Sequence, residues 1–114
     1  MTVLMFLKYL AVVVTLATGA ISIFSPKTIK GFTGLEASSP RAISEIRAVM
    51  GGTFLGLGIA AFVLNTPEVY KMIGIAYAAI ALIRGISIPV DRSTDRSNII
   101  SLATEVVLAV VLIW

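Results

Sequence analysis

The sequence contains neither cysteine nor histidine. Their absence excludes disulfide bonds, thiolate nucleophiles, Cys/His zinc sites, iron–sulfur ligation and His-ligated haem. Serine hydrolase chemistry is not expected either, because Ser44, Ser101 and Thr104 have no histidine base and no Gly-x-Ser-x-Gly segment is present. We therefore expect a protein that is not an enzyme and that holds no cofactor and no metal.

Charged residues are scarce, at 13% of the chain, whereas hydrophobic residues make up 58% and the mean hydropathy is +1.02. This composition is too apolar for an ordinary soluble domain, and 114 residues are too few for two domains. We expect residues 1–114 to form a single integral membrane domain. The net charge of +3 does not indicate nucleic-acid binding, because the basic residues lie between apolar stretches rather than in one patch.

Four apolar stretches approach the length of about 20 residues that a helix needs to cross a bilayer. They predict an all-α bundle of four transmembrane helices, with spans at about residues 3–24, 46–64, 69–88 and 98–114. The first stretch loosely resembles a signal peptide at its Ala17–Ala20 end, but no basic residue precedes Lys8, so we expect it to remain as a span.

Serine, threonine and proline mark the expected helix ends. Ser39-Pro40 and Thr66-Pro67 each combine an N-cap residue with a proline suited to the first helical turn. Pro89 is expected to break the third span after Ile88.

The loop after the first span predicts a short interfacial helix. Ser25-Pro26 ends the span, and Lys27–Lys30 follow before Gly31. We expect the lysines to face phosphates and Ile29 and Phe32 to face acyl chains, although a solvated loop is an equal alternative.

Basic residues are unevenly distributed between the two sides of the predicted bundle. The loops after the first and third spans contain Lys27, Lys30, Arg41, Arg92 and Arg96, whereas the opposite side has only Lys8 and Lys71. By the positive-inside rule these loops are cytoplasmic and both termini face outward. We expect a multi-pass protein of the bacterial cytoplasmic membrane.

A glycine-rich segment opens the second span. At about 100° per residue, Glu45, Gly52 and Gly56 share one face of a helix, and Gly51 and Gly58 share the nearly opposite one. Both faces predict close helix packing, with Gly52-x-x-x-Gly56 as the contact for a second backbone. A phosphate-binding loop is not expected, because no strand precedes the glycines and no Lys-Ser/Thr follows them.

Two charged residues inside the apolar stretches are expected at similar depth. Arg84 lies near the end of the third span and Glu105 near the start of the fourth, while Glu45 and Arg47 enter the second span on the same side. A charge in hydrocarbon costs at least about 2.5 kcal/mol, so such residues pair or reach the interface. We expect Glu105 to accept hydrogen bonds from Arg84, Arg47 or both.

Polar residues near this pair predict a pocket. Asn98, Ser101 and Glu105 form one stripe on the fourth span, and Tyr77 lies on the same face of the third span as Arg84. The cluster is either a buried ion pair that fixes helix register or a site for an anionic head group, a quinone-like molecule or a proton. Because arginine pairs with carboxylate and phosphate, an anionic lipid is the plainest ligand.

The chain resembles small bacterial four-helix membrane proteins of unknown function, distantly similar to the DoxX-like group. The resemblance rests on Glu45-x-Arg47-Ala48-x-x-Gly51-Gly52, on Arg84 near the end of the third span, and on Glu105 in the fourth. It implies the four-helix fold and is nearly silent on function.

Small size, short loops and glycine faces favour a non-enzymatic accessory or scaffold subunit of a larger membrane complex. Its expected partners are the lipid bilayer, other membrane subunits or further copies of itself, and a bound lipid. The alternative is a small transporter, or a membrane protein that binds lipid, quinone or anion through the Arg/Glu cluster.

Overall fold

The computed structural model describes residues 2–114, which contain helices and no strand. Four continuous helical stretches are long and apolar enough to cross a membrane: α1 (Val3–Phe24), the stretch Pro40–Leu64, α5 (Pro67–Val90) and α6 (Arg96–Ile113). The second stretch consists of α3 (Pro40–Glu45), a π-helical turn (Ile46–Gly51) and α4 (Gly52–Leu64). The all-α class and the four membrane-compatible helices are therefore confirmed.

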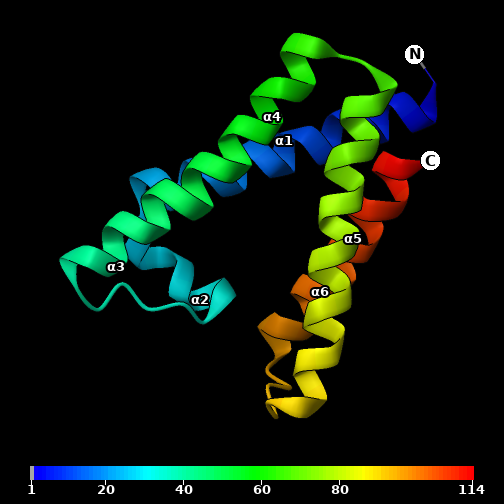
Figure 1. The fold of residues 1–114 in the computed structure, drawn as a ribbon. Coiled ribbons are helices and arrows are strands. Elements are labelled where there is room, and N and C mark those ends of the chain that lie inside the picture. Colours follow the sequence, from blue (N-terminus) through cyan, green and yellow to red (C-terminus); the bar gives the residue numbers. More distant parts are fainter. Residues whose placement is uncertain (1) are drawn as a thin grey trace.

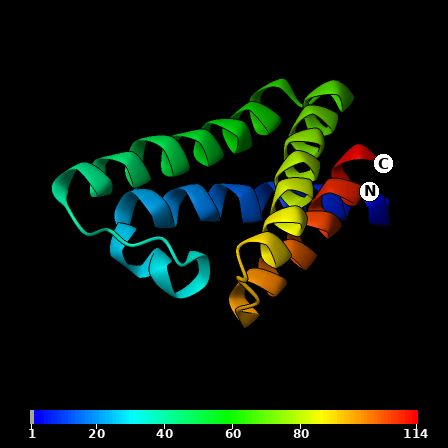
Figure 2. The ribbon, with the colours of Figure 1, turned by 60° about the horizontal axis from the view of Figure 1, so that its bottom comes forward.

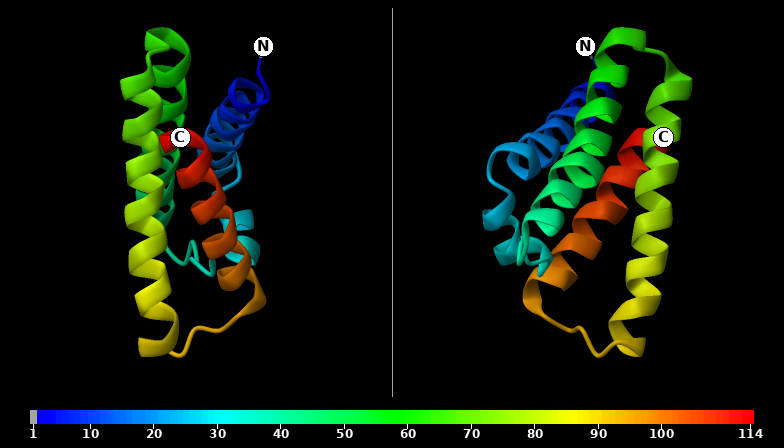
Figure 3. Two further views of the ribbon diagram at one scale, coloured as in Figure 1. Left: turned by 90° about the vertical axis from the view of Figure 1, so that its right-hand side faces the viewer. Right: turned by 60° about the vertical axis from the view of Figure 1, so that its left-hand side comes forward.

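The long helices form two antiparallel pairs that meet at one end and separate toward the other (Figure 1). One pair is α1 with α4, and the other is α5 with α6. Both termini and the α4–α5 turn lie toward one end, and the two longer loops lie toward the opposite end (Figure 3). The longest dimension is 43 Å, which matches a bilayer of about 40–45 Å including its head groups.

Side-chain caps begin three of the long helices, as the sequence predicts for two of them. Ser39 accepts from Ala42 N at 3.1 Å, and Thr66 accepts from Val69 N at 3.4 Å. The expected break at Pro89 is wrong, because α5 continues to Val90. A proline in the last turn removes only one hydrogen bond there, and the following Asp91 N still donates to Ser87 O at 2.7 Å.

Close contact between α1 and the second span depends on Gly19, Gly51 and Gly58. A Cβ atom at Gly19 would lie 2.5 Å from Leu55 N, while Cβ atoms at Gly51 and Gly58 would collide with Ile23 and Leu16. Cβ atoms at Gly52 and Gly56 would meet nothing within 4 Å among the described residues. Within the chain, α1 thus packs on Gly51 and Gly58, while Gly52-x-x-x-Gly56 faces outward.

The π-helical turn disrupts the face that the sequence assigns to Glu45 and the glycines. A π turn closes i→i+5 hydrogen bonds and so contains more residues than an α turn. The 3.6-residue period therefore does not extend through Ile46–Gly51. Faces drawn from Glu45 through to Gly56 on an ideal α-helix do not describe this segment.

The short helix in the first loop is present but differs from expectation. A 3-10 turn (Pro26–Ile29) leads into α2 (Lys30–Thr33), which ends at Gly34 in the left-handed conformation (φ 75°) rather than at Gly31. Ile29 is completely buried, so its expected contact with acyl chains is wrong. The 3-10 turn packs on α1, and α2 reaches across to α6 (Figure 2).

Two polar contacts join the helix pairs. Lys8 Nζ donates to Leu112 O at 3.0 Å, at the negative C-terminal end of α6, and lies 5.8 Å from the centre of the Tyr70 ring. Thr15 and Tyr77 share a hydrogen bond of 2.6 Å between α1 and α5. The sequence indicates only a role in topology for Lys8, whereas in the structure the Lys8 side chain is buried between helices.

Replacing Gly19 with alanine tests the close contact between α1 and α4. The added Cβ lies 2.5 Å from backbone Leu55 N, so we expect Gly19→Ala to lower the free energy of unfolding by about 1–3 kcal/mol. Gly56→Ala is the matched control, since its Cβ meets open space and alanine favours helix. The measurement is unfolding in mixed micelles, and equal stability of the two variants would contradict the packing.

Candidate functional site

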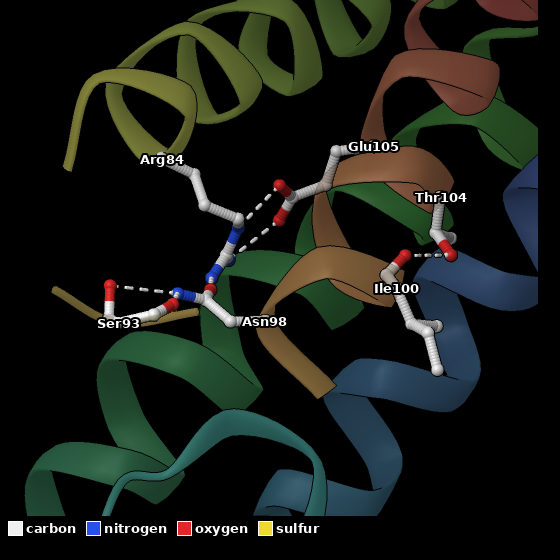
Figure 4. Close-up of polar contacts among 6 residues, drawn as sticks. All are labelled: Arg84, Ser93, Asn98, Ile100, Thr104 and Glu105. Carbon is white, nitrogen blue, oxygen red and sulfur yellow. Dashed lines mark hydrogen bonds and ion pairs between the residues drawn. The ribbon is translucent and has the colours of Figure 1, made fainter. Parts of the chain in front are cut away.

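The Arg84 side chain of α5 forms a two-pronged ion pair with Glu105 of α6 (Figure 4). Arg84 Nε donates to Glu105 Oε1 at 2.7 Å, and Nη2 donates to Oε2 at 2.8 Å. The side chains are 29% and 13% exposed, respectively. Parallel charge-assisted bonds of this kind fix both distance and orientation, so the pair sets the register of α5 against α6.

Asn98 extends the ion pair into the α5–α6 loop (Figure 4). Arg84 Nη1 donates to Asn98 Oδ1 at 2.7 Å, and Asn98 Nδ2 donates to Ser93 O at 2.8 Å. The guanidinium thus contacts the first and third turns of α6 at once. The polar stripe that the sequence assigns to α6 does face Arg84.

Arg47 and Glu45 lie away from this pair. Arg47 Nε donates to Ile23 O at 2.9 Å, which satisfies a backbone carbonyl in the last turn of α1. Glu45 pairs with Arg41 at 2.6 Å in an exposed i,i+4 contact. Glu105 therefore receives hydrogen bonds from Arg84, whereas Arg47 contacts a carbonyl of α1 instead.

A cavity of about 290 Å³ lies between the two helix pairs and includes Arg84 and Glu105 in its wall. Of the other three residues of the predicted pocket, Tyr77 and Ser101 also line it, whereas Asn98 does not. The remaining lining residues come from α1, α2, the π turn, α4 and α6: Val14, Thr18, Phe32, Thr33, Met50, Phe54, Ile100, Thr104 and Leu108. We call this space the central cavity. Glu45 and Arg47 do not line it.

Aromatic rings form part of the cavity wall. The rings of Phe54 and Tyr77 lie 6.2 Å apart at 34°, and Phe32 enters from α2. Nothing in the sequence indicates that α2 or Phe54 lines the pocket, because neither periodicity nor charge shows which helices become neighbours. Thr15 of α1, which shares a hydrogen bond with the Tyr77 hydroxyl, is not among the residues that the sequence assigns to the site.

A larger groove of about 570 Å³ runs along α5 and α6 toward the chain end. All of its lining residues are apolar, from Ala78 to Trp114, and they offer no polar side chain except the indole N–H of Trp114. Lipid chains fill such a surface in a bilayer. The central cavity, smaller but with an ion pair and hydroxyl groups, is the better candidate for a specific site.

The lining of the central cavity combines hydrogen-bonding groups with apolar side chains. Among residues 2–114, no group of three or more acidic, cysteine or histidine side chains is arranged to hold a metal ion. The Arg84 and Glu105 charges compensate each other. The arrangement is thus suited to holding a small molecule.

A double-mutant cycle tests whether Arg84 and Glu105 act as one unit. Glu105→Gln leaves a guanidinium without its counter-charge, so we expect a loss of about 1–3 kcal/mol in unfolding free energy. Arg84→Met leaves the carboxylate unpaired and has a similar cost, whereas Arg84→Met/Glu105→Gln costs less than the sum because no charge remains.

The exposed Arg41–Glu45 pair serves as the control for that cycle. The Arg41 and Glu45 side chains are 81% and 50% exposed, so the same type of cycle should give a coupling energy of less than about 1 kcal/mol. Strictly additive costs at Arg84 and Glu105 would contradict a coupled pair.

Comparison with known proteins gives the chain a family. No curated protein and no solved structure matches it. A family model described as a domain of unknown function (DUF4345) matches residues 3–114, nearly the full length. The expectation of an uncharacterised family is confirmed, and the chain belongs to the DUF4345 family of unknown function.

Proposed function

We propose that this protein is a non-enzymatic membrane protein that binds a small amphiphilic molecule in the central cavity. The observation that carries the proposal is the combination of about 290 Å³ of space with a wall that contains the Arg84–Glu105 pair, several hydroxyl groups and apolar side chains. Ligand sites typically combine an apolar lining with a few convergent polar groups.

An ion pair that only fixes helix register does not need a cavity beside it. Protein interiors are close-packed, with few voids larger than a water molecule, and unfilled space forfeits dispersion contacts. At about 30 Å³ per water, the cavity has room for roughly ten waters or an equivalent small molecule. Space of this size next to polar side chains favours an occupant.

Filling the cavity tests the proposal. Ser101→Leu adds apolar volume at a lining position, and Ser97→Leu adds the same volume one turn earlier on α6, outside the cavity lining. The test is to extract tagged protein from membranes in polymer nanodiscs and to identify the bound small molecules by mass spectrometry. We expect a stoichiometric molecule with the wild type and Ser97→Leu, and its loss in Ser101→Leu at unchanged thermal stability.

The same experiment can also contradict the binding proposal. If the wild type carries only the bulk lipids of the membrane, in bulk proportions, the binding proposal fails. Loss of the molecule from both variants would place it outside the cavity.

An accessory or scaffold subunit is the second candidate, favoured by the outward face of α4. Gly52 and Gly56 are exposed, and Cβ atoms there would meet nothing within 4 Å. Small residues at this spacing let another transmembrane helix approach closely. A stoichiometric larger protein in the nanodisc fraction, without a small molecule, would support this role instead.

The proposed location is the bacterial cytoplasmic membrane, with the loops after α1 and α5 inside and the termini outside. Support comes from the excess of basic residues in those loops. The fold is compatible with it, because both loops lie toward one end of the molecule (Figure 3). A distant kinship with DoxX-like proteins remains part of this proposal.

Single cysteines test the orientation directly, since the native chain has none. Glu68→Cys lies at the start of α5 and Thr94→Cys in the α5–α6 loop, and both positions are exposed. We expect a membrane-impermeant maleimide to label Glu68→Cys on intact cells and Thr94→Cys only after lysis. The reverse pattern would invert the topology.

A further inference from the structure

We propose that the molecule in the central cavity is an uncharged amphiphile whose head both donates and accepts hydrogen bonds. The inference rests on the proposed binding function and names its ligand class. It departs from the anionic lipid that the sequence favours, because the structure provides a different electrostatic environment from the one expected.

The cavity wall has no net charge to offer an ion. Arg84 and Glu105 are the two charged residues among its lining residues, and each is the other's partner through two hydrogen bonds. A phosphate or carboxylate head would have to displace Glu105 or lie close to its negative charge in a low-dielectric site. Arg47, the second cation expected here, binds Ile23 O instead. An uncharged head avoids this penalty.

Hydrogen-bond donors remain in the wall after the protein's own bonds are made. A guanidinium has five N–H groups, and Arg84 uses three of them, two on Glu105 and one on Asn98. Within residues 2–114, the Ser101 hydroxyl forms no hydrogen bond with another side chain or the backbone, although Ser101 lines the cavity. A carbonyl or hydroxyl oxygen of the ligand can accept from these groups.

Acceptors remain as well. Thr18, Thr33 and Thr104 each donate their hydroxyl proton to a carbonyl of their own helical segment, at 2.7–2.9 Å. The hydroxyl oxygens of these threonines can still accept a hydrogen bond from a ligand, although Thr33 also accepts one from Leu35 N. Glu105 accepts two bonds from Arg84 and retains further lone pairs. A ligand with a hydroxyl group can therefore donate here.

Size and wall chemistry limit the head group. About 290 Å³ holds roughly ten groups the size of water, which corresponds to one ring or one glycerol unit with a few methylenes. Phe32, Phe54 and Tyr77 supply apolar ring surfaces around that space. A longer hydrocarbon tail has to leave the cavity into the bilayer.

Two matched pairs of probes test whether the cavity prefers an uncharged head group. Dioleoylglycerol is offered against dioleoyl phosphatidate, and 4-dodecylphenol against 4-dodecylbenzoate, so that the members of a pair differ chiefly in head-group charge. Purified wild-type protein receives both members of a pair at equal concentration, and native mass spectrometry counts the retained adducts. We expect at least one neutral probe to be retained about tenfold more than its anionic partner.

Variants assign the adduct to the cavity. We expect Ser101→Ala to reduce retention of the neutral probe about threefold to tenfold through loss of one hydrogen bond, and Ser101→Leu to abolish it. Ser97→Ala is the matched control and should retain the probe like the wild type. An adduct that persists in Ser101→Leu lies on the surface and overturns the inference.

The remaining outcomes separate the two proposals. Preference for phosphatidate or benzoate overturns the neutral-ligand inference while the binding function stands. Retention of none of the four probes overturns both.

Discussion

The two-pronged bond between Arg84 and Glu105 is the interaction on which the second half of the structure depends. A bilayer gives a lone guanidinium or carboxylate no solvent, so the two must meet, and the fork geometry allows one relative placement of α5 and α6. Asn98 adds a third bond and connects the same guanidinium to the loop through Ser93. Within residues 2–64, no ion pair joins the long helices of the first pair, which are held by close packing of Gly19 on the backbone of α4 and by the Arg47 hydrogen bond to Ile23 O. The molecule is therefore two helix pairs, each held together by a different kind of interaction.

The central cavity follows from how these pairs are joined. Lys8 binds the end of α6, and Thr15 binds Tyr77, so the pairs are tied near the chain termini and at Tyr77. Beyond Tyr77 the helices separate, and α2 lies across the widening space against α6 (Figure 2). Arg84 and Glu105 both line that space. The wall of the central cavity therefore contains polar groups without net charge, together with apolar side chains.

Much of the fold can be predicted from the sequence, because hydropathy and helix caps are local signals. The first span matches α1, and Ser39-Pro40 and Thr66-Pro67 begin helices as expected. The Arg84–Glu105 bond was also predictable, since a short loop places both residues at one depth. Other features depend on tertiary contacts that one sequence does not reveal. Arg47 turns to an α1 carbonyl, Ile29 is buried by packing of its 3-10 turn, and the π turn breaks the periodicity on which the glycine faces were assigned.

The most direct test of the central cavity as a binding site is a structure of the protein in native lipid nanodiscs, prepared without detergent and resolved to individual side chains. We predict a non-protein molecule between the helix pairs, with a polar atom within hydrogen-bond distance of Ser101 Oγ or the Arg84 guanidinium and its tail directed into the bilayer. Arg84 and Glu105 remain paired in that structure. If the protein's own side chains fill the cavity, or an acyl chain does so without polar contact, the cavity is not a binding site and the ion pair is a purely structural link.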